Sequence, residues 1–337
     1  MYRQPKEKQL VLLVDGQPYV GHHCESTSLV NLLGQRGVDL SEPLVFGLGS
    51  GLSFTYWRTK RMPAPFLGGR IRPDRLTAQV AEVLGLRLTV RETSSGKRAR
   101  EQLLHDLDSG TVVGLKLDRY ELDYSTDDYR FAAHYVACVG YDGDRFALVE
   151  TRPLGLRWAS GESLARARSA RGPMSSRNLS FTIAPPDGPL PDLGEAARRA
   201  VRTTAESFLN PPIANLGFKG MHKAADLMPG WIDDLASPRE ALVEMATLME
   251  EGGTGGGLFR TMWADFLAET AELTGAAEFR DLSDAYRLVS GNWTRVAELL
   301  HEAGTAGDRA PLEHASKLVH ELAQEEQRLM RQLSDAA

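Results

Sequence analysis

The spacing of hydrophobic residues divides the chain into two parts of different character. In the first part, short helical and strand-like patterns alternate up to about residue 183. Apolar residues at helical spacing predict helices over residues 25–35, 74–84 and 97–108. Runs of apolar and β-branched residues predict strands over residues 86–90, 111–117, 134–141, 145–150 and 178–183. Because helices come first and a set of antiparallel strands follows, we expect an α+β domain.

Helical patterns dominate the second part of the chain. They predict helices over residues 194–208, 219–228, 237–250, 258–273 and 311–333. Between the two parts, residues 184–194 contain four prolines and two glycines, which interrupt both helices and sheet ladders. The sequence therefore predicts a first domain over residues 1–185, a linker over 186–193 and an all-α domain over 194–337.

The composition is that of an ordinary globular protein. Of the 337 residues, 42% are hydrophobic and 25% are charged, and the net charge of −6 argues against a general nucleic-acid binder. No apolar run approaches the roughly 18 residues of a membrane helix, and the first residues lack the apolar core of a signal peptide. The two cysteines cannot form a disulfide framework. We therefore expect a cytoplasmic protein that binds neither membranes nor nucleic acid.

Three residues stand at positions that suit nucleophilic catalysis. Cys24 directly precedes the predicted helix 25–35, and the N-terminus of a helix favours the reactive thiolate. His134 opens one predicted strand and Glu150 ends the next. The turn signal at residues 142–144 lies near the middle of that interval, so a hairpin would bring Glu150 back beside His134. In such a site His134 would activate Cys24 and Glu150 would orient the imidazole.

The same residues also permit interpretations without chemistry. A cysteine before a helix can be a small buried hydrophobe, and a histidine in an apolar strand can be a satisfied core residue. Cys138 lies on the same strand face as His134 and is predicted to be a core residue. A zinc site built from His22, His23, Cys24, His134 and Cys138 would lack the close ligand pairs of structural zinc sites, so no metal is predicted.

Longer motifs resemble the butirosin biosynthesis protein H family. Residues 22–27 and 41–54 resemble its N-terminal domain, and residues 134–150 and 163–170 fit the same family. Residues 253–260 resemble the helical domain commonly attached to it. The resemblance implies a papain-like fold, similar to bacteriocin-processing cysteine peptidases. It also implies an acyltransferase that moves an aminoacyl group from an acyl carrier protein thioester onto an amine of an aminoglycoside.

On this resemblance, Cys24 would carry the acyl group, with His134 as general base and Glu150 as the orienting acid. Oxyanion donors would come from the backbone of Cys24 and from Gln17 or His23. The protein itself would need no cofactor, since 4'-phosphopantetheine arrives on the carrier protein. A thiol hydrolase, amidase or cyclising enzyme on the same fold is the alternative, and a non-catalytic binding protein with a vestigial site is another. The helical domain would cover one side of the cleft or mediate a homodimer.

An arginine-rich segment covers residues 152–177. Acyl carrier proteins are acidic, so Arg166, Arg168 and Arg171 are candidates for docking the donor by charge pairing. A solvated helix face is the alternative interpretation.

An acidic and aromatic segment, residues 118–128, precedes the strand of His134. Its residues Asp123, Tyr124, Asp127 and Asp128 are candidates for binding a small cationic amine acceptor. The alternative is a polar surface loop.

Overall fold

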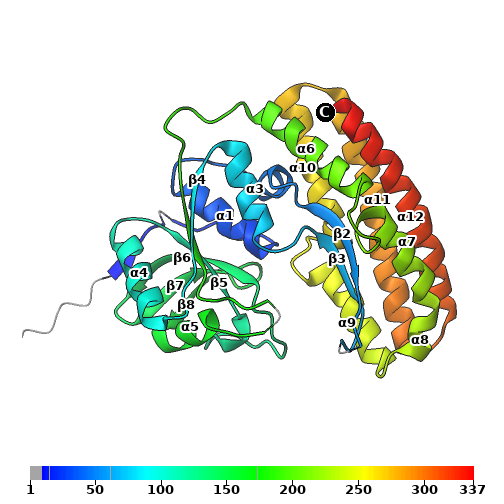
Figure 1. The fold of residues 1–337 in the computed structure, drawn as a ribbon, viewed down its shortest axis with the longest axis horizontal. Coiled ribbons are helices and arrows are strands. Elements are labelled where there is room, and N and C mark those ends of the chain that lie inside the picture. Colours follow the sequence, from blue (N-terminus) through cyan, green and yellow to red (C-terminus); the bar gives the residue numbers. More distant parts are fainter. Residues whose placement is uncertain (1–9, 15, 61, 173) are drawn as a thin grey trace, which may run out of the picture. The chain divides into compact units, whose positions relative to one another are not determined.

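The chain folds into two compact units, which a computed structural model describes over residues 10–14, 16–60, 62–172 and 174–337 (Figure 1). Unit 1 combines the described residues up to Val45 with Gly85–Leu190, and unit 2 combines Phe46–Leu84 with Pro191–Ala337. This division differs from the predicted domains 1–185 and 194–337. Residues 46–84 pack with the helical unit, although they interrupt unit 1 in the sequence.

A mixed sheet-and-helix architecture characterises unit 1. Its described strands are β1 (Leu10–Leu12), β4 (Arg87–Arg91), β5 (Val113–Leu117), β6 (His134–Asp142), β7 (Arg145–Val149), β8 (Leu156–Ser160) and β9 (Ser180–Ala184). They form a seven-stranded sheet in the order β4-β9-β5-β6-β7-β8, with β1 also paired to β6. All of these pairs are antiparallel. The central strand β6 is buried from His134 to Tyr141.

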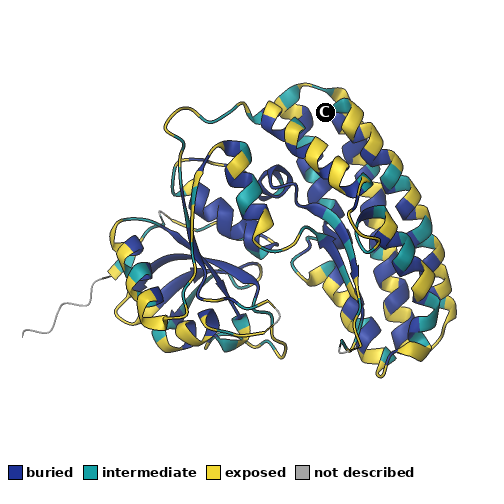
Figure 2. Ribbon diagram, in the orientation of Figure 1, coloured by how far each residue is buried: buried dark blue, intermediate teal, exposed yellow. Residues whose placement is uncertain are grey.

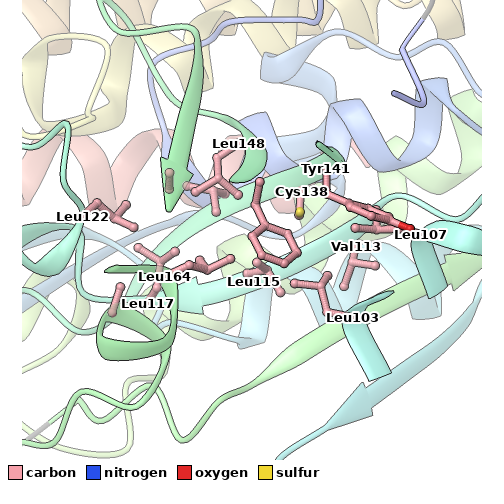
Figure 3. Packing of buried hydrophobic residues seen from close by; sticks show 14 residues of the cluster. Leu103, Leu107, Val113, Leu115, Leu117, Leu122, Cys138, Tyr141, Leu148 and Leu164 are labelled. Atoms are coloured by element: carbon pink, nitrogen blue, oxygen red, sulfur yellow. The ribbon is translucent and has the colours of Figure 1, made fainter. Parts of the chain in front are cut away.

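Helices of unit 1 pack against this sheet. Helix α1 (Cys24–Gly34) packs against β6 and buries Leu29, Leu32 and Leu33. A hydrophobic cluster brings apolar side chains of β5, β6 and β7 together with those of α4 (Gly96–Asp108) and α5 (Gly161–Arg168), as Figure 3 shows. Burial of this apolar surface stabilises the strand that begins with His134.

The hairpin predicted at residues 142–144 is confirmed. Asp142 pairs with Arg145 across a tight turn, in which Gly143 adopts a φ of +60°, a conformation that favours glycine. Further along the ladder Ala137 pairs with Val149. Glu150 therefore follows β7 at the end of the hairpin where β6 begins with His134.

Helices make up most of unit 2. They are α3 (Arg75–Leu84), α6 (Leu193–Leu209), α7 (Gly217–Leu227), α8 (Trp231–Asp234), α9 (Pro238–Glu251), α10 (Arg260–Thr274), α11 (Ala277–Ala306) and α12 (Ala310–Ala336), with short 3-10 turns at Met228–Gly230 and Gly257–Phe259. Helix α2 (Glu42–Leu48) spans the boundary between the units. The described residues from 191 onward contain no strand, in agreement with the predicted helical C-terminal region.

Two features of unit 2 depart from the prediction. Strands β2 (Leu52–Trp57) and β3 (Phe66–Arg70) form a two-stranded sheet, so unit 2 is not all-α. Side chains of β2 alternate between buried and partly exposed, which is the strand period. The long helix α11 was also not predicted, although it buries residues such as Phe279, Leu282 and Tyr286 at helical spacing.

Strands β5, β6 and β7 are largely buried, and the helices alternate buried and exposed faces, as Figure 2 shows. In the ranges that the structure describes, no helix combines the length and the apolar character needed to cross a membrane.

Candidate active site

Cys24 is the first residue of α1 and is partly exposed. His23 caps the helix: its backbone is extended, with φ −95° and ψ 126°, and its side chain accepts a hydrogen bond from the backbone N–H of Ser26. The sulfur therefore lies at the N-terminal end of α1, where the first-turn N–H groups and the positive end of the helix dipole are found. Both favour the thiolate over the thiol.

A buried carboxylate, Glu42, holds the segment that leads to Cys24. Its side chain accepts hydrogen bonds from the backbone N–H groups of His22 and His23, each at 2.9 Å, and from the hydroxyls of Ser26 and Thr27 at 2.9 and 3.0 Å. A Cβ on Gly21 would lie 2.4 Å from the carboxylate, so this approach requires glycine. The sequence does not predict this role of Glu42, because no spacing rule links Glu42 to Cys24.

His134 and Glu150 form a buried pair next to Cys24. The Nε2 atom of His134 lies 2.7 Å from Oε2 of Glu150, and the two side chains are 10% and 0% exposed. The imidazole is also hydrogen-bonded to the Cys24 side chain. Because Nε2 is engaged by Glu150, the nitrogen left for the sulfur is Nδ1. The structure thus brings the three predicted catalytic residues together.

A backbone link fixes the two sides of this site to each other. The backbone N–H of Arg152, two residues beyond Glu150, donates to the carbonyl of Gly21 at 2.9 Å. The guanidinium of Arg152 donates to the carbonyl of Val20 at 3.0 Å. The chain that follows β7 is therefore tied to the chain that precedes Cys24.

The electrostatics of the pair favour a charged imidazole. Burial opposes protonation of His134, but the Glu150 carboxylate and the hydrogen bonds to Cys24 and Glu150 outweigh it and raise its pKa to about 10. Burial likewise opposes ionisation of Glu150, yet His134, Tyr124 and Arg119 hold the pKa of this carboxyl below its usual value. An imidazolium beside the sulfur stabilises the Cys24 thiolate.

Three of the four residues of the acidic segment proposed to bind the amine make hydrogen bonds inside unit 1. Tyr124 donates its hydroxyl to Oε1 of Glu150 at 2.7 Å. Asp127 accepts two hydrogen bonds from Arg119, both at 2.6 Å, and Asp123 accepts from the backbone N–H of Ser160 at 3.0 Å. Asp128 alone of the four candidates is exposed without such a contact among the described residues.

The arginine-rich segment requires a correction at Arg168. This residue is only 3% exposed, and it donates to the backbone carbonyls of Ala99 and Asn178. Burial lowers its pKa to about 10. It therefore supports α5 from inside and is not a docking residue. Arg166 is half exposed and pairs with Glu162 at 2.8 Å, and Arg171 is exposed.

The two residues proposed as oxyanion donors lie in different surroundings. Gln17 is exposed in the segment before α1. The backbone N–H of His23 donates to Glu42, and its Nδ1 lies 3.0 Å from the Ser26 hydroxyl, so this residue acts as a helix cap. The backbone N–H of Cys24 remains as a candidate donor at the start of α1.

Cys138 lies in the hydrophobic core of unit 1. The Cys138 side chain is fully buried in the hydrophobic cluster of unit 1, where burial raises the pKa of its thiol to about 12. Within the described ranges, no group of three or more His, Cys, Asp or Glu side chains is arranged to hold a metal ion.

Comparison with protein families covers most of the chain. Residues 23–151 match the family described as Butirosin biosynthesis protein H, N-terminal, and this range includes Cys24, His134 and Glu150. Residues 162–333 match a Domain of unknown function (DUF4872). No curated protein matches the chain significantly. The chain therefore carries an N-terminal domain of the butirosin biosynthesis protein H family, followed by a DUF4872 domain in its C-terminal half.

Proposed function

We propose that the protein is a cysteine-dependent acyltransferase of antibiotic-type biosynthesis, with a papain-like unit 1. The observation that carries the proposal is the arrangement of Cys24, His134 and Glu150: a partly exposed sulfur at a helix N-terminus, hydrogen-bonded to a buried imidazole that a buried carboxylate orients. A purely structural cysteine needs none of these partners. The family's description, which names butirosin biosynthesis, supports the biosynthetic context.

The first half-reaction transfers the acyl group to the protein. The Cys24 thiolate attacks the carbonyl carbon of a carrier-bound thioester, and the sulfur–carbon bond to the carrier breaks. The departing 4'-phosphopantetheine thiolate takes the proton of the His134 imidazolium, which leaves a neutral imidazole beside the acyl-enzyme. Because one thioester replaces another, the step depends mainly on positioning and on donors to the developing oxyanion, such as the backbone N–H of Cys24.

The second half-reaction forms an amide. The acceptor amine attacks the acyl-Cys24 carbonyl, and neutral His134 takes the proton that the amine loses. The sulfur–carbon bond then breaks and restores the Cys24 thiolate beside a protonated His134. Water in place of the amine would give a free acid, which is the hydrolase alternative. A vestigial site would form no acyl-enzyme at all.

The two substrates differ in charge, which suggests different contacts on unit 1. An acidic acyl carrier protein would meet the exposed Arg166 and Arg171, and a small cationic amine would meet the exposed carboxylate of Asp128.

Intact-mass analysis tests the proposal. The protein is mixed with acyl-loaded carrier proteins and with simple acyl thioesters, and its mass is compared with those of Cys24→Ala and Cys138→Ala. We expect the mass of one acyl group on the wild type and on Cys138→Ala, and none on Cys24→Ala. Addition of an amine should then release an amide. A free acid as the product would favour the hydrolase, and a wild type without any adduct would refute the catalytic role of Cys24.

A further inference from the structure

The hydroxyl of Tyr124 contacts the Glu150 carboxylate at the oxygen that His134 does not contact. We propose that Tyr124 is a fourth member of the site, a positioning residue whose hydroxyl fixes the Glu150 carboxylate against His134. The inference rests on the proposed function only in taking acyl transfer as the reaction of this site. Its geometric basis lies entirely within unit 1.

Both oxygens of Glu150 have a donor. Oε1 accepts from the Tyr124 hydroxyl at 2.7 Å, and Oε2 lies 2.7 Å from Nε2 of His134. The side chain has no exposed surface, so water does not replace either donor. With one donor on each oxygen, the carboxylate plane is held in the orientation that the imidazole requires. A buried ionised oxygen without a donor is costly, so loss of the tyrosine hydroxyl disfavours the carboxylate form.

Tyr124 is itself held on several sides. Its side chain packs against the hydrophobic cluster of unit 1. Before it in the chain, Asp123 accepts a hydrogen bond from the backbone N–H of Ser160. After it, Asp127 accepts two hydrogen bonds from the Arg119 guanidinium. The hydroxyl therefore meets Glu150 from an anchored segment.

The charged groups around the pair keep the tyrosine a donor. Glu150 faces His134, Tyr124 and Arg119, and Tyr124 faces Glu150, Arg119 and Asp123. Burial and the adjacent Glu150 carboxylate raise the pKa of Tyr124 far above its ordinary value, against the smaller opposing effect of Arg119. The hydroxyl thus stays protonated across the pH range in which Glu150 is ionised.

The consequence for catalysis is transmitted through His134. Without the hydroxyl, ionised Glu150 is less favoured, and the imidazolium that it supports is less favoured too. The Cys24 thiolate, which pairs with that imidazolium, should then form only at higher pH.

The test replaces Tyr124 by phenylalanine, which keeps the ring and removes the oxygen. Tyr120→Phe is the matched control, because Tyr120 lies in the same segment, is 42% exposed and packs its ring under Arg130. The rate of Cys24 alkylation by iodoacetamide is measured against pH. For Tyr124→Phe we expect the rising, acidic part of the rate–pH profile to shift to higher pH by about one unit. At a given pH in this range, alkylation should then be about tenfold slower. Tyr120→Phe should follow the wild type.

Two further measurements separate positioning from loss of structure. Circular dichroism checks that Tyr124→Phe is folded, and a purely packing role would lower thermal stability without moving the alkylation midpoint. In a Glu150→Gln background, Tyr124→Phe should add no further shift, because the carboxylate that it acts on is gone. An unchanged midpoint in folded Tyr124→Phe, or an equal shift in Tyr120→Phe, overturns the proposal.

Alkylation also distinguishes this proposal from the proposed function, since it needs no acyl donor. A wild type that forms an acyl adduct while Tyr124→Phe keeps the wild-type pH profile would remove Tyr124 and leave the acyltransferase. A shifted profile in a protein that forms no adduct would support Tyr124 and remove the acyltransferase.

Discussion

Each unit buries a carboxylate beside a cationic side chain, and the two pairs differ in what the cation can do. In unit 1 the pair is Glu150 and His134. In unit 2 it is Glu326 and Arg260, whose side chains are both 0% exposed and whose Nη2 and Oε2 atoms lie 3.0 Å apart. The two pairs have similar burial and similar distances, so neither property marks a reactive site.

The difference lies in the remaining contacts of each cation. The Arg260 guanidinium also donates to the carbonyl of Leu258 and lies over the Trp293 ring, while Trp293 donates to Glu326, so that all partners are internal. Arginine side chains in general stay protonated near neutral pH and do not act as proton donors. His134 can lose its proton, and its second nitrogen faces a partly exposed sulfur. Under our proposal, a titratable cation beside the Cys24 sulfur makes the first pair reactive, whereas the second pair links helices α10, α11 and α12.

The largest effect should come from breaking the pair in unit 2. Glu326→Gln leaves the charge of Arg260 buried without its counter-ion, and we expect a loss of about 3–5 kcal/mol in the free energy of unfolding. Tryptophan fluorescence during denaturant unfolding measures this loss of stability, because four of the five tryptophans, all except Trp158, lie in unit 2.

A double replacement sharpens this result. Arg260→Met with Glu326→Leu removes both charges and should recover most of the lost stability. The pH profile of Cys24 alkylation should be unchanged in all of these variants while they are folded. A loss below about 1 kcal/mol for Glu326→Gln, the value of an exposed pair, would contradict the structural role of the pair.

A smaller effect should appear in the pH dependence of the folding stability of unit 1. The pKa of His134 is raised from 6.5 to about 10, so its charged form stabilises the folded state fully below pH 6.5. This stabilisation should be lost as the pH rises through about 10. The pKa of Glu150 is lowered, so its contribution should be lost as the pH falls below the usual carboxyl range. Thermal unfolding of wild type and His134→Gln between pH 6 and 10 checks the alkaline side, and parallel curves would exclude this linkage.

The smallest effect concerns exposed charges. Arg166→Glu with Arg171→Glu should raise the KM for a carrier-bound donor by about three- to tenfold at low salt, because exposed charges act mainly on encounter. The KM for a short free thioester should not change. Arg98→Glu, an exposed arginine on α4, is the matched control. An equal rise with both donors, or the same rise in Arg98→Glu, would remove carrier docking at these arginines.

The grouping of Cys24, His134 and Glu150 could be predicted because its signals are local. A cysteine before a helical pattern, a histidine opening a strand and a turn near the middle of the interval to Glu150 are all properties of short segments. Backbone periodicity and turn chemistry decide such segments almost independently of the rest of the chain. The same holds for the helical C-terminal region.

Beyond this grouping, the tertiary structure alone decided which side chains became partners. Arg168 and Arg166 are two residues apart on one helix, yet one is buried against backbone carbonyls and the other is half exposed. Glu42 and Tyr124 reach the site from segments that no sequence period connects to Cys24 or Glu150. Partnership of this kind depends on how distant segments pack, and a pattern that repeats every two or four residues carries no information about it.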